Sequence, residues 1–240
     1  MSARSDAKSG TLHGLGLGPG DPGLITRRAA QIIETAEVIA YPTLAGGDSF
    51  ARAIAADLIP ANAREIRIDI PMTTARAPAQ AAYDKAAEVI ASILSTGTDV
   101  VCLCEGDPFF YGSFMYLFAR LRPRHPVEIT PGVTSMTACA AAAHQPLTAR
   151  NEVMTILPAP LPDDTLRDHL HRAETIACLK VGRHLPRLRA LLDAEGLLDM
   201  ATYVERASLG AERVLPLADA PEAAPYFSMI LISKGADPWL

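Results

Sequence analysis

The chain has 240 residues, of which 49% are apolar and 20% are charged, and its formal net charge is −5. This composition is typical of a globular protein and excludes a disordered chain, and the length suits one large domain or two modest ones. The negative net charge argues against a general nucleic-acid binder, because phosphate binding needs an excess of basic residues.

Residues 1–10, MSARSDAKSG, are small and polar. They lack the apolar core of a signal peptide, so we expect a mobile tail there. No uninterrupted apolar segment reaches the length that a bilayer span requires. These features favour a cytoplasmic protein without membrane contact.

The predicted elements alternate between strands and helices. In the first half we expect strands at 12–17, 38–41, 66–70, 100–104 and 127–129, and helices at 27–37, 50–58, 78–94, 114–121 and 133–143. In the second half we expect strands at 153–157, 175–179, 201–204 and 227–232, and helices at 164–171 and 184–195. The sequence therefore predicts an α/β protein with an N-terminal domain at 11–143 and a C-terminal domain at 144–240.

The segment 99–113, DVVCLCEGDPFFYGS, joins an expected strand to an expected helix. Pro108 lacks an N–H group and ends the strand, and Gly106 permits a sharp turn. Ser113 can cap the helix that follows. Because ligands bind beyond the carboxyl ends of strands in open α/β sheets, this turn is the first candidate site; an ordinary connection with core phenylalanines is the alternative.

Residues 18–23, GPGDPG, match the G-x-G-x-x-G pattern of dinucleotide-binding proteins. Pro19 and Pro22 remove two of the N–H donors that such a loop offers to a pyrophosphate, and Asp21 adds a negative charge. We therefore disfavour dinucleotide binding and expect a loop shaped for an uncharged or carbon-based reaction partner.

A second turn at a strand end, TPGVTS at 130–135, opens an expected helix. Thr134 and Ser135 offer hydroxyl and N–H groups to a ligand, although Thr130 or Thr134 could simply cap the helix. Two such turns at neighbouring strand ends would form one shared crevice.

The second half has charged segments at two expected strand ends, KVGRH at 180–184 and ERAS at 205–208. Their charges are either solvated or form a basic rim for an acidic ligand. His169 and His171 would diverge on a helix, which makes them a poor metal pair. The four cysteines form no CxxC pair, so we expect a reducing compartment, no disulfides and no metal site.

Three segments together resemble the class III S-adenosylmethionine-dependent tetrapyrrole methyltransferases of cobalamin biosynthesis: 14–26 (GLGLGPGDPGLIT), 105–117 (EGDPFFYGSFMYL) and 129–147 (ITPGVTSMTACAAAAHQPL). The resemblance extends over essentially the whole chain after the tail. The second segment is the most specific, and it is similar to the branch that methylates C20 of precorrin-2 to give precorrin-3A. The resemblance implies a homodimer of chains with two α/β domains, with the methyl donor in the cleft between the domains.

The resemblance also implies roles for particular residues. S-adenosylmethionine, which leaves as S-adenosylhomocysteine, would be held by Gly106, Asp107, Phe110, Thr134, Ser135, Val181 and Ala207. The tetrapyrrole would contact Gly18, Pro19, Gly20, Asp21 and Arg183. Because that substrate carries many carboxylates, further candidate anchors by charge alone are Arg27, Arg28, Arg150 and Arg206.

The chemistry of such a transfer limits what the protein must do. The sulfonium methyl is already activated, so no covalent enzyme nucleophile is needed. Aligning the reacting atoms and excluding water can supply up to ~10 kcal/mol. A proton must later leave the methylated carbon, and Tyr111 and Asp107 are the candidate catalytic residues, with water as the alternative.

Four other functions stay open on the sequence. Two of them are also methyl transfers to a tetrapyrrole: C20 methylation of a cobalt-loaded substrate, cobalt-factor II, or methylation of another tetrapyrrole such as uroporphyrinogen III. The other two are a nicotinamide oxidoreductase and a non-catalytic tetrapyrrole carrier. Transfer of a labelled methyl group separates the methyltransferases from the rest.

Overall fold

The computed structural model describes residues 9–44, 47–71 and 76–235. Most of the expected tail, residues 1–8, lies outside the described residues, and Gly10 donates its N–H to the Leu94 carbonyl at 2.8 Å. The chain divides into two compact units, Met1–Thr134 and Ser135–Leu240.

The first unit contains a parallel sheet with the strand order β3-β2-β4-β1-β5. Its strands are β1 (Leu12–Gly16), β2 (Val38–Leu44), β3 (Arg64–Ile70), β4 (Val100–Cys104) and β5 (Val127–Thr130). Its helices are α1 (Arg27–Glu34), α2 (Phe50–Ile54), α3 (Arg76–Leu94) and α4 (Phe114–Leu121), with short 3₁₀ helices η1 (Pro22–Leu24) and η2 (Ala56–Leu58). All five carboxyl ends therefore lie along one edge of this sheet.

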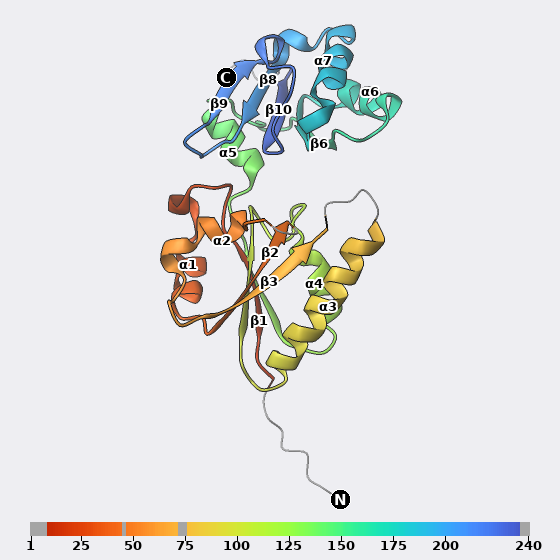
Figure 1. Cartoon of the computed structure of the whole chain (residues 1–240). Helices are drawn as coiled ribbons and strands as arrows, with labels where there is room; N and C mark the ends of the chain where they lie inside the picture. Colours follow the sequence, from red (N-terminus) through yellow and green to blue (C-terminus); the bar gives the residue numbers. More distant parts are fainter. Residues whose placement is uncertain (1–8, 45–46, 72–75, 236–240) are drawn as a thin grey trace, which may run out of the picture. The chain divides into compact units, whose positions relative to one another are not determined.

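Helices cover both faces of the first sheet (Figure 1). On one face, α3 and α4 bury Val100 and Cys102 of β4, and on the other face α1 and α2 bury Val101 and Leu103. All five residues of β4 are buried. A parallel strand covered on both faces reads as a continuous apolar run, which is why 100–104 has no polar alternation.

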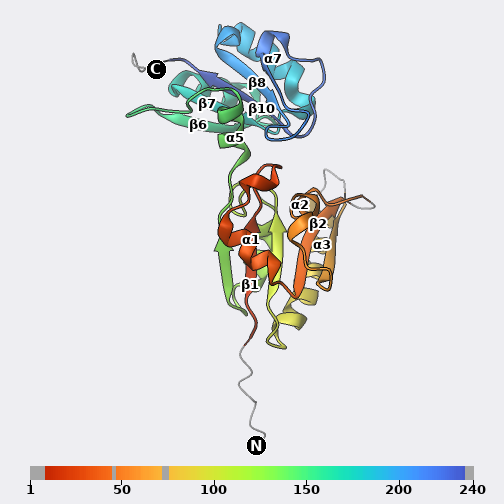
Figure 2. The ribbon, with the colours of Figure 1, turned by 90° about the vertical axis from the view of Figure 1, so that its left-hand side faces the viewer.

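The second unit contains a mixed sheet with the strand order β6-β7-β10-β8-β9. Its strands are β6 (Met154–Pro158), β7 (Thr175–Leu179), β8 (Ala201–Glu205), β9 (Arg213–Pro216) and β10 (Ser228–Ser233). Its helices are α5 (Ser135–Ala142), α6 (Asp163–Arg172) and α7 (Leu185–Ala194), with η3 (Gly182–His184), η4 (Leu198–Met200) and η5 (Leu217–Asp219). Helix α5 packs against β8 and β10 (Figure 2), and the leucines of α6 and α7 join the main core of this unit.

Strand β10 runs antiparallel to both of its neighbours, β7 and β8. Its first residues therefore lie beside the carboxyl ends of those two strands. This arrangement brings the loops after β7 and β8 to the start of β10.

The α/β fold class expected from the sequence is confirmed, with two sheets. Strand β9 escaped prediction because it is a short edge strand that ends in Pro216. Ser113 stands at the N-terminus of α4 as expected, but its side chain makes no capping hydrogen bond. Within the described residues, no helix is both long and apolar enough to span a bilayer.

Candidate functional site

Strand β1 lies between β4 and β5 in the sheet, so the two expected turns do not follow adjacent strands. The ends of β4, β1 and β5 nevertheless pack tightly through glycines. A Cβ atom on Gly16 would lie 2.5 Å from the Gly132 nitrogen and 2.7 Å from the Gly106 oxygen. A Cβ atom on Gly132 would lie 2.1 Å from the Gly106 oxygen. Backbone atoms cannot move aside cheaply, so only glycine allows this close approach of the three turns.

The loop 18–21 and the turn after β4 are joined directly. The Gly106 N–H donates to the Gly18 carbonyl at 2.8 Å, and the Gly18 N–H donates to the Gly106 carbonyl at 3.2 Å. The expected substrate loop and the expected donor turn of the first unit are therefore parts of one structure.

Asp107 ties two of the turns together with one carboxylate. Its Oδ1 accepts the Phe109 N–H at 2.8 Å, and its Oδ2 accepts the Gly132 N–H at 3.0 Å. Hydrogen bonds to an ionised acceptor are about twice as strong as neutral ones. Asp107 thus holds the turn after β4 against the turn after β5, which leads to Thr134.

The turn after β4 leaves its backbone accessible and strained. Gly106 has φ +63°, and a Cβ atom built on it would meet nothing within 4 Å. Tyr111 also has a positive φ, 56°, which is uncommon for a residue with a large side chain and often marks a functional turn. Its half-exposed ring contacts the Phe110 ring edge-on at 5.2 Å between centroids. Phe109 instead packs on Phe118 of α4, at 4.9 Å.

Glu105 links the same turn to α2. Burial raises the pKa of the Glu105 carboxyl, while a hydrogen bond from the backbone N–H of Ala51 lowers it. Ala51 lies in the first turn of α2, whose N-cap Ser49 bonds the Arg52 N–H at 3.2 Å. The carboxyl therefore lies close to the first turn of α2.

Asp21 has a capping role. Its Oδ1 accepts the Gly23 N–H at 2.7 Å, at the N-cap of η1. Thr26 caps α1 by accepting the Ala29 N–H at 3.2 Å, as the sequence predicts. The proline-bearing loop is thus anchored at both ends, by the hydrogen bonds between Gly18 and Gly106 in the turn after β4 and by the cap at Asp21.

In the second unit, the turns that carry Val181 and Ala207 both attach to the start of β10. The Gly182 N–H donates to Ser228 Oγ at 3.3 Å, and the Arg206 N–H donates to the Phe227 carbonyl at 2.8 Å. Val181 and Ala207 are buried, whereas Arg183 on η3 is exposed. Ser135 begins α5, which packs on β8 and β10 of the same sheet.

Glu205 is buried, whereas a solvated charge was one of the expectations for this strand end. Its side chain is 0% exposed and is bound by Arg206 and Arg213. Sequence reasoning gave Glu205 no role, because its partner Arg213 lies on the strand that was not predicted. The sequence feature that comes closest to indicating this cluster is the short spacing between Glu205, Arg206 and Arg213.

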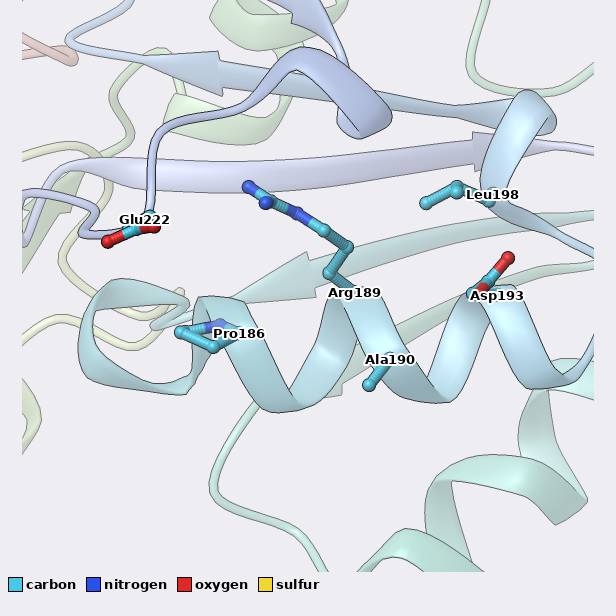
Figure 3. A pocket seen from close by; sticks show the side chains of 6 residues that line it. All are labelled: Pro186, Arg189, Ala190, Asp193, Leu198 and Glu222. Atoms are coloured by element: carbon cyan, nitrogen blue, oxygen red, sulfur yellow. The ribbon is translucent and has the colours of Figure 1, made fainter.

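A hollow of about 530 Å³ lies on the second unit beside α7, lined by Pro186, Arg189, Ala190, Asp193, Leu198 and Glu222. Figure 3 shows Arg189 reaching from α7 across this hollow. Its guanidinium donates to the carbonyls of Ala220 and Pro221, the latter at 2.8 Å. Arg189 therefore has a structural role, because it holds the segment that contains Ala220 and Pro221. None of the expected site residues lines the hollow.

A model of the tetrapyrrole (corrin/porphyrin) methylases matches residues 11–221. The chain belongs to the tetrapyrrole methylase family. The region matched includes every residue that the sequence analysis selected for donor or substrate binding.

Three curated members of this family are similar to the chain. The cobalamin biosynthesis protein CobIJ of Mycobacterium tuberculosis is 43% identical, over 98% of this chain and 47% of that protein, so the chain spans about half of its length. The precorrin-2 C(20)-methyltransferase of a Sinorhizobium species is 39% identical, over 95% of this chain and 97% of that enzyme. The cobalt-precorrin-2 C(20)-methyltransferase of Salmonella typhimurium is 30% identical, over 94% and 97%.

Solved structures of tetrapyrrole methylases have the same fold. The uroporphyrin III C-methyltransferase of Thermus thermophilus superposes with a TM-score of 0.68 at 26% identity, covering 94% of this chain and 98% of that one. The α/β fold that the family resemblance implies is thus confirmed, with one sheet in each of the two units.

The first unit has features that fit a methyl donor of this family. Gly106 presents open backbone in a left-handed conformation, where a ligand could approach closely. Its own N–H and carbonyl are bonded to Gly18, so the turn is held in place before any ligand binds. These observations fit a donor site at this turn.

Proposed function

We propose that the chain transfers a methyl group from S-adenosylmethionine to C20 of precorrin-2, giving precorrin-3A and S-adenosylhomocysteine in cobalamin biosynthesis. The observation that carries this proposal is the match to the Sinorhizobium enzyme over nearly the whole of both chains. The hydrogen-bonded turns at Gly18 and Gly106 support it, because they form a strand-end site that is held in place and open to a ligand.

S-adenosylmethionine, when bound, supplies a methyl group that its sulfonium charge has already activated. In the first unit we assign its binding to Gly106, Asp107, Phe110 and Thr134. In the second unit we assign it to Ser135, Val181 and Ala207. Because Val181 and Ala207 are buried, their contribution would be made through the backbone of their turns.

For the tetrapyrrole we assign the loop Gly18 to Asp21, with Pro19 as a rigid wall, and Arg183 as an anchor for a carboxylate. Pro19 has no N–H group and the Gly18 N–H is bonded to Gly106, so this loop suits a shaped wall better than an anion cradle. Arg183 is exposed, and no hydrogen bond or ion pair involves its side chain within the described residues, so it is available to a ligand carboxylate.

Both oxygens of Asp107 accept backbone N–H groups, so we assign Asp107 to holding the donor turn. Loss of the proton from the methylated carbon is then assigned to Tyr111 or to water. Tyr111 is half exposed, on the turn that carries Gly106. We further propose a cytoplasmic homodimer, whose dimeric state is supported by the family resemblance alone; light scattering that gives the mass of a monomer at micromolar concentration would contradict the dimer.

The test is an anaerobic incubation of the purified chain with precorrin-2 and S-adenosylmethionine that carries a ¹³C methyl group. We expect one added methyl group by mass and a single new resonance assigned to C20 by NMR. Transfer to a different carbon, or no transfer, would refute the proposal. A thermal shift with NADH but none with S-adenosylhomocysteine would favour the oxidoreductase.

A second candidate is the same methylation on a cobalt-loaded substrate, favoured by the 30% identity to the Salmonella enzyme. Parallel incubations with precorrin-2, cobalt-factor II and uroporphyrinogen III separate the candidates by kcat/KM. We expect precorrin-2 to be the preferred substrate of the three.

A further inference from the structure

Glu205 is the last residue of β8, and its side chain is completely buried. Its Oε2 accepts the Tyr203 hydroxyl at 2.6 Å, and its Oε1 accepts Arg213 Nε at 2.7 Å and Arg206 Nη1 at 3.0 Å. A buried charge needs opposite charge and good hydrogen bonds, and this cluster supplies both. The hydrogen bond from Arg213, opposed by burial, lowers the pKa of Glu205, so the carboxylate is charged at neutral pH.

The two arginines lie at opposite ends of a single loop. Arg206 follows β8 directly, and Arg213 is the first residue of β9 and pairs with Glu205 across the hairpin. One carboxylate therefore ties together both ends of the loop 206–212, which contains Ala207.

This loop has an unfavourable backbone conformation. Arg206 has φ +51° and Ser208 has φ +69°, in the left-handed region that residues with a Cβ atom avoid. Ser208 donates its N–H to Glu212 Oε2 at 2.7 Å, and Arg206 donates its N–H to the Phe227 carbonyl at 2.8 Å. Such a conformation persists only where surrounding contacts hold it.

We infer that Glu205 is a positioning residue that holds the 206–212 loop in the conformation needed to present Ala207 to the methyl donor. This inference rests on the proposed function, in which Ala207 contacts S-adenosylmethionine. Without the negative charge, the guanidinium groups of Arg206 and Arg213 would repel each other, and the strained residues would relax. Donor binding would then lose a preformed loop and would have to order it.

The first unit offers a matched control with the same chemistry. Glu65 accepts the Tyr41 hydroxyl at 2.6 Å and is bound by Arg52 through Nε at 2.6 Å and Nη2 at 2.9 Å. Glu65 lies near the amino end of β3, the end of the parallel sheet opposite the strand-end turns. Glu65→Gln removes a similar carboxylate without touching the residues assigned to the donor.

The experiment compares the wild-type chain, Glu205→Gln and Glu65→Gln at a temperature well below each melting point. S-adenosylhomocysteine affinity is measured by calorimetry, and amide exchange of residues 206–212 by mass spectrometry. We expect Glu205→Gln to weaken affinity about tenfold, as for loss of a charge-assisted contact, with faster exchange in the loop. Glu65→Gln should stay within about twofold of the wild type. With precorrin-2, the KM for S-adenosylmethionine should rise more than kcat falls.

A purely structural role would lower the melting temperature of Glu205→Gln and leave the affinity of the folded protein unchanged, which would overturn the inference. If that variant does not fold, Arg213→Gln detaches only the β9 end of the loop, and an unchanged affinity there would overturn it equally. A wild-type chain that binds no S-adenosylhomocysteine would instead overturn the proposed function, and the inference with it.

Discussion

Gly106→Ala tests the donor site most directly. Gly106 has φ +63°, and its new Cβ atom would point into open space. The change therefore creates no clash in the ligand-free chain, and the left-handed backbone alone costs ~1–2 kcal/mol. A ligand packed closely on this turn would meet the added methyl group, and overpacking costs ~1–3 kcal/mol. At about 1.4 kcal/mol for each tenfold change, S-adenosylhomocysteine should bind roughly 5- to 150-fold more weakly.

Gly196→Ala is the matched control. Gly196 follows α7 in the second unit, has φ +67°, and also has no atom within 4 Å of a built Cβ. It carries the same backbone cost but belongs to no expected site. Calorimetry with S-adenosylhomocysteine and thermal melting should show similar destabilisation for both variants and lost affinity for Gly106→Ala alone. Wild-type affinity in Gly106→Ala, or an equal loss in both, would refute a donor site at this turn.

Three further changes have distinct expected outcomes. Asp107→Asn can accept only one of the two backbone N–H groups that Asp107 accepts, so we expect ~1–3 kcal/mol less stability in urea unfolding and weaker S-adenosylhomocysteine binding; unchanged stability would contradict its role in holding the turn. Asp21→Asn can still cap η1, so we expect normal melting and cofactor affinity but weaker use of precorrin-2; lost cofactor affinity would show the substrate assignment to be wrong. Arg213 lowers the pKa of Glu205 below its ordinary value of 4.5. The contribution of the Glu205 carboxylate to folding stability is therefore fully present above pH 4.5 and is lost as the pH falls further and the carboxylate is protonated. Stability of Glu205→Gln should therefore fall less steeply in acid than that of the wild type, as followed by circular dichroism.

The sequence by itself determined most of the elements and their class. The apolar run of β4 and the N-cap at Thr26 are local patterns, and local hydrogen bonds and burial suffice to read them. Pro19 and Pro22 argued against a phosphate cradle without any structure, because a missing N–H depends only on residue type. The two strand-end turns could also be selected as a candidate site from their local residue types. Only the fold shows that the second turn, 130–135, is divided between the two compact units.

Tertiary structure alone decided which of these pieces touch. The bridge between Gly18 and Gly106 joins segments far apart in the chain, and its register follows from the order β4-β1-β5. Ser113 looks like a helix cap locally, yet its side chain makes no capping hydrogen bond in the folded chain. Glu205 reads as a solvated charge until the edge strand β9 brings Arg213 beside it. Such contacts depend on the packing of distant segments, which no local pattern of residues encodes.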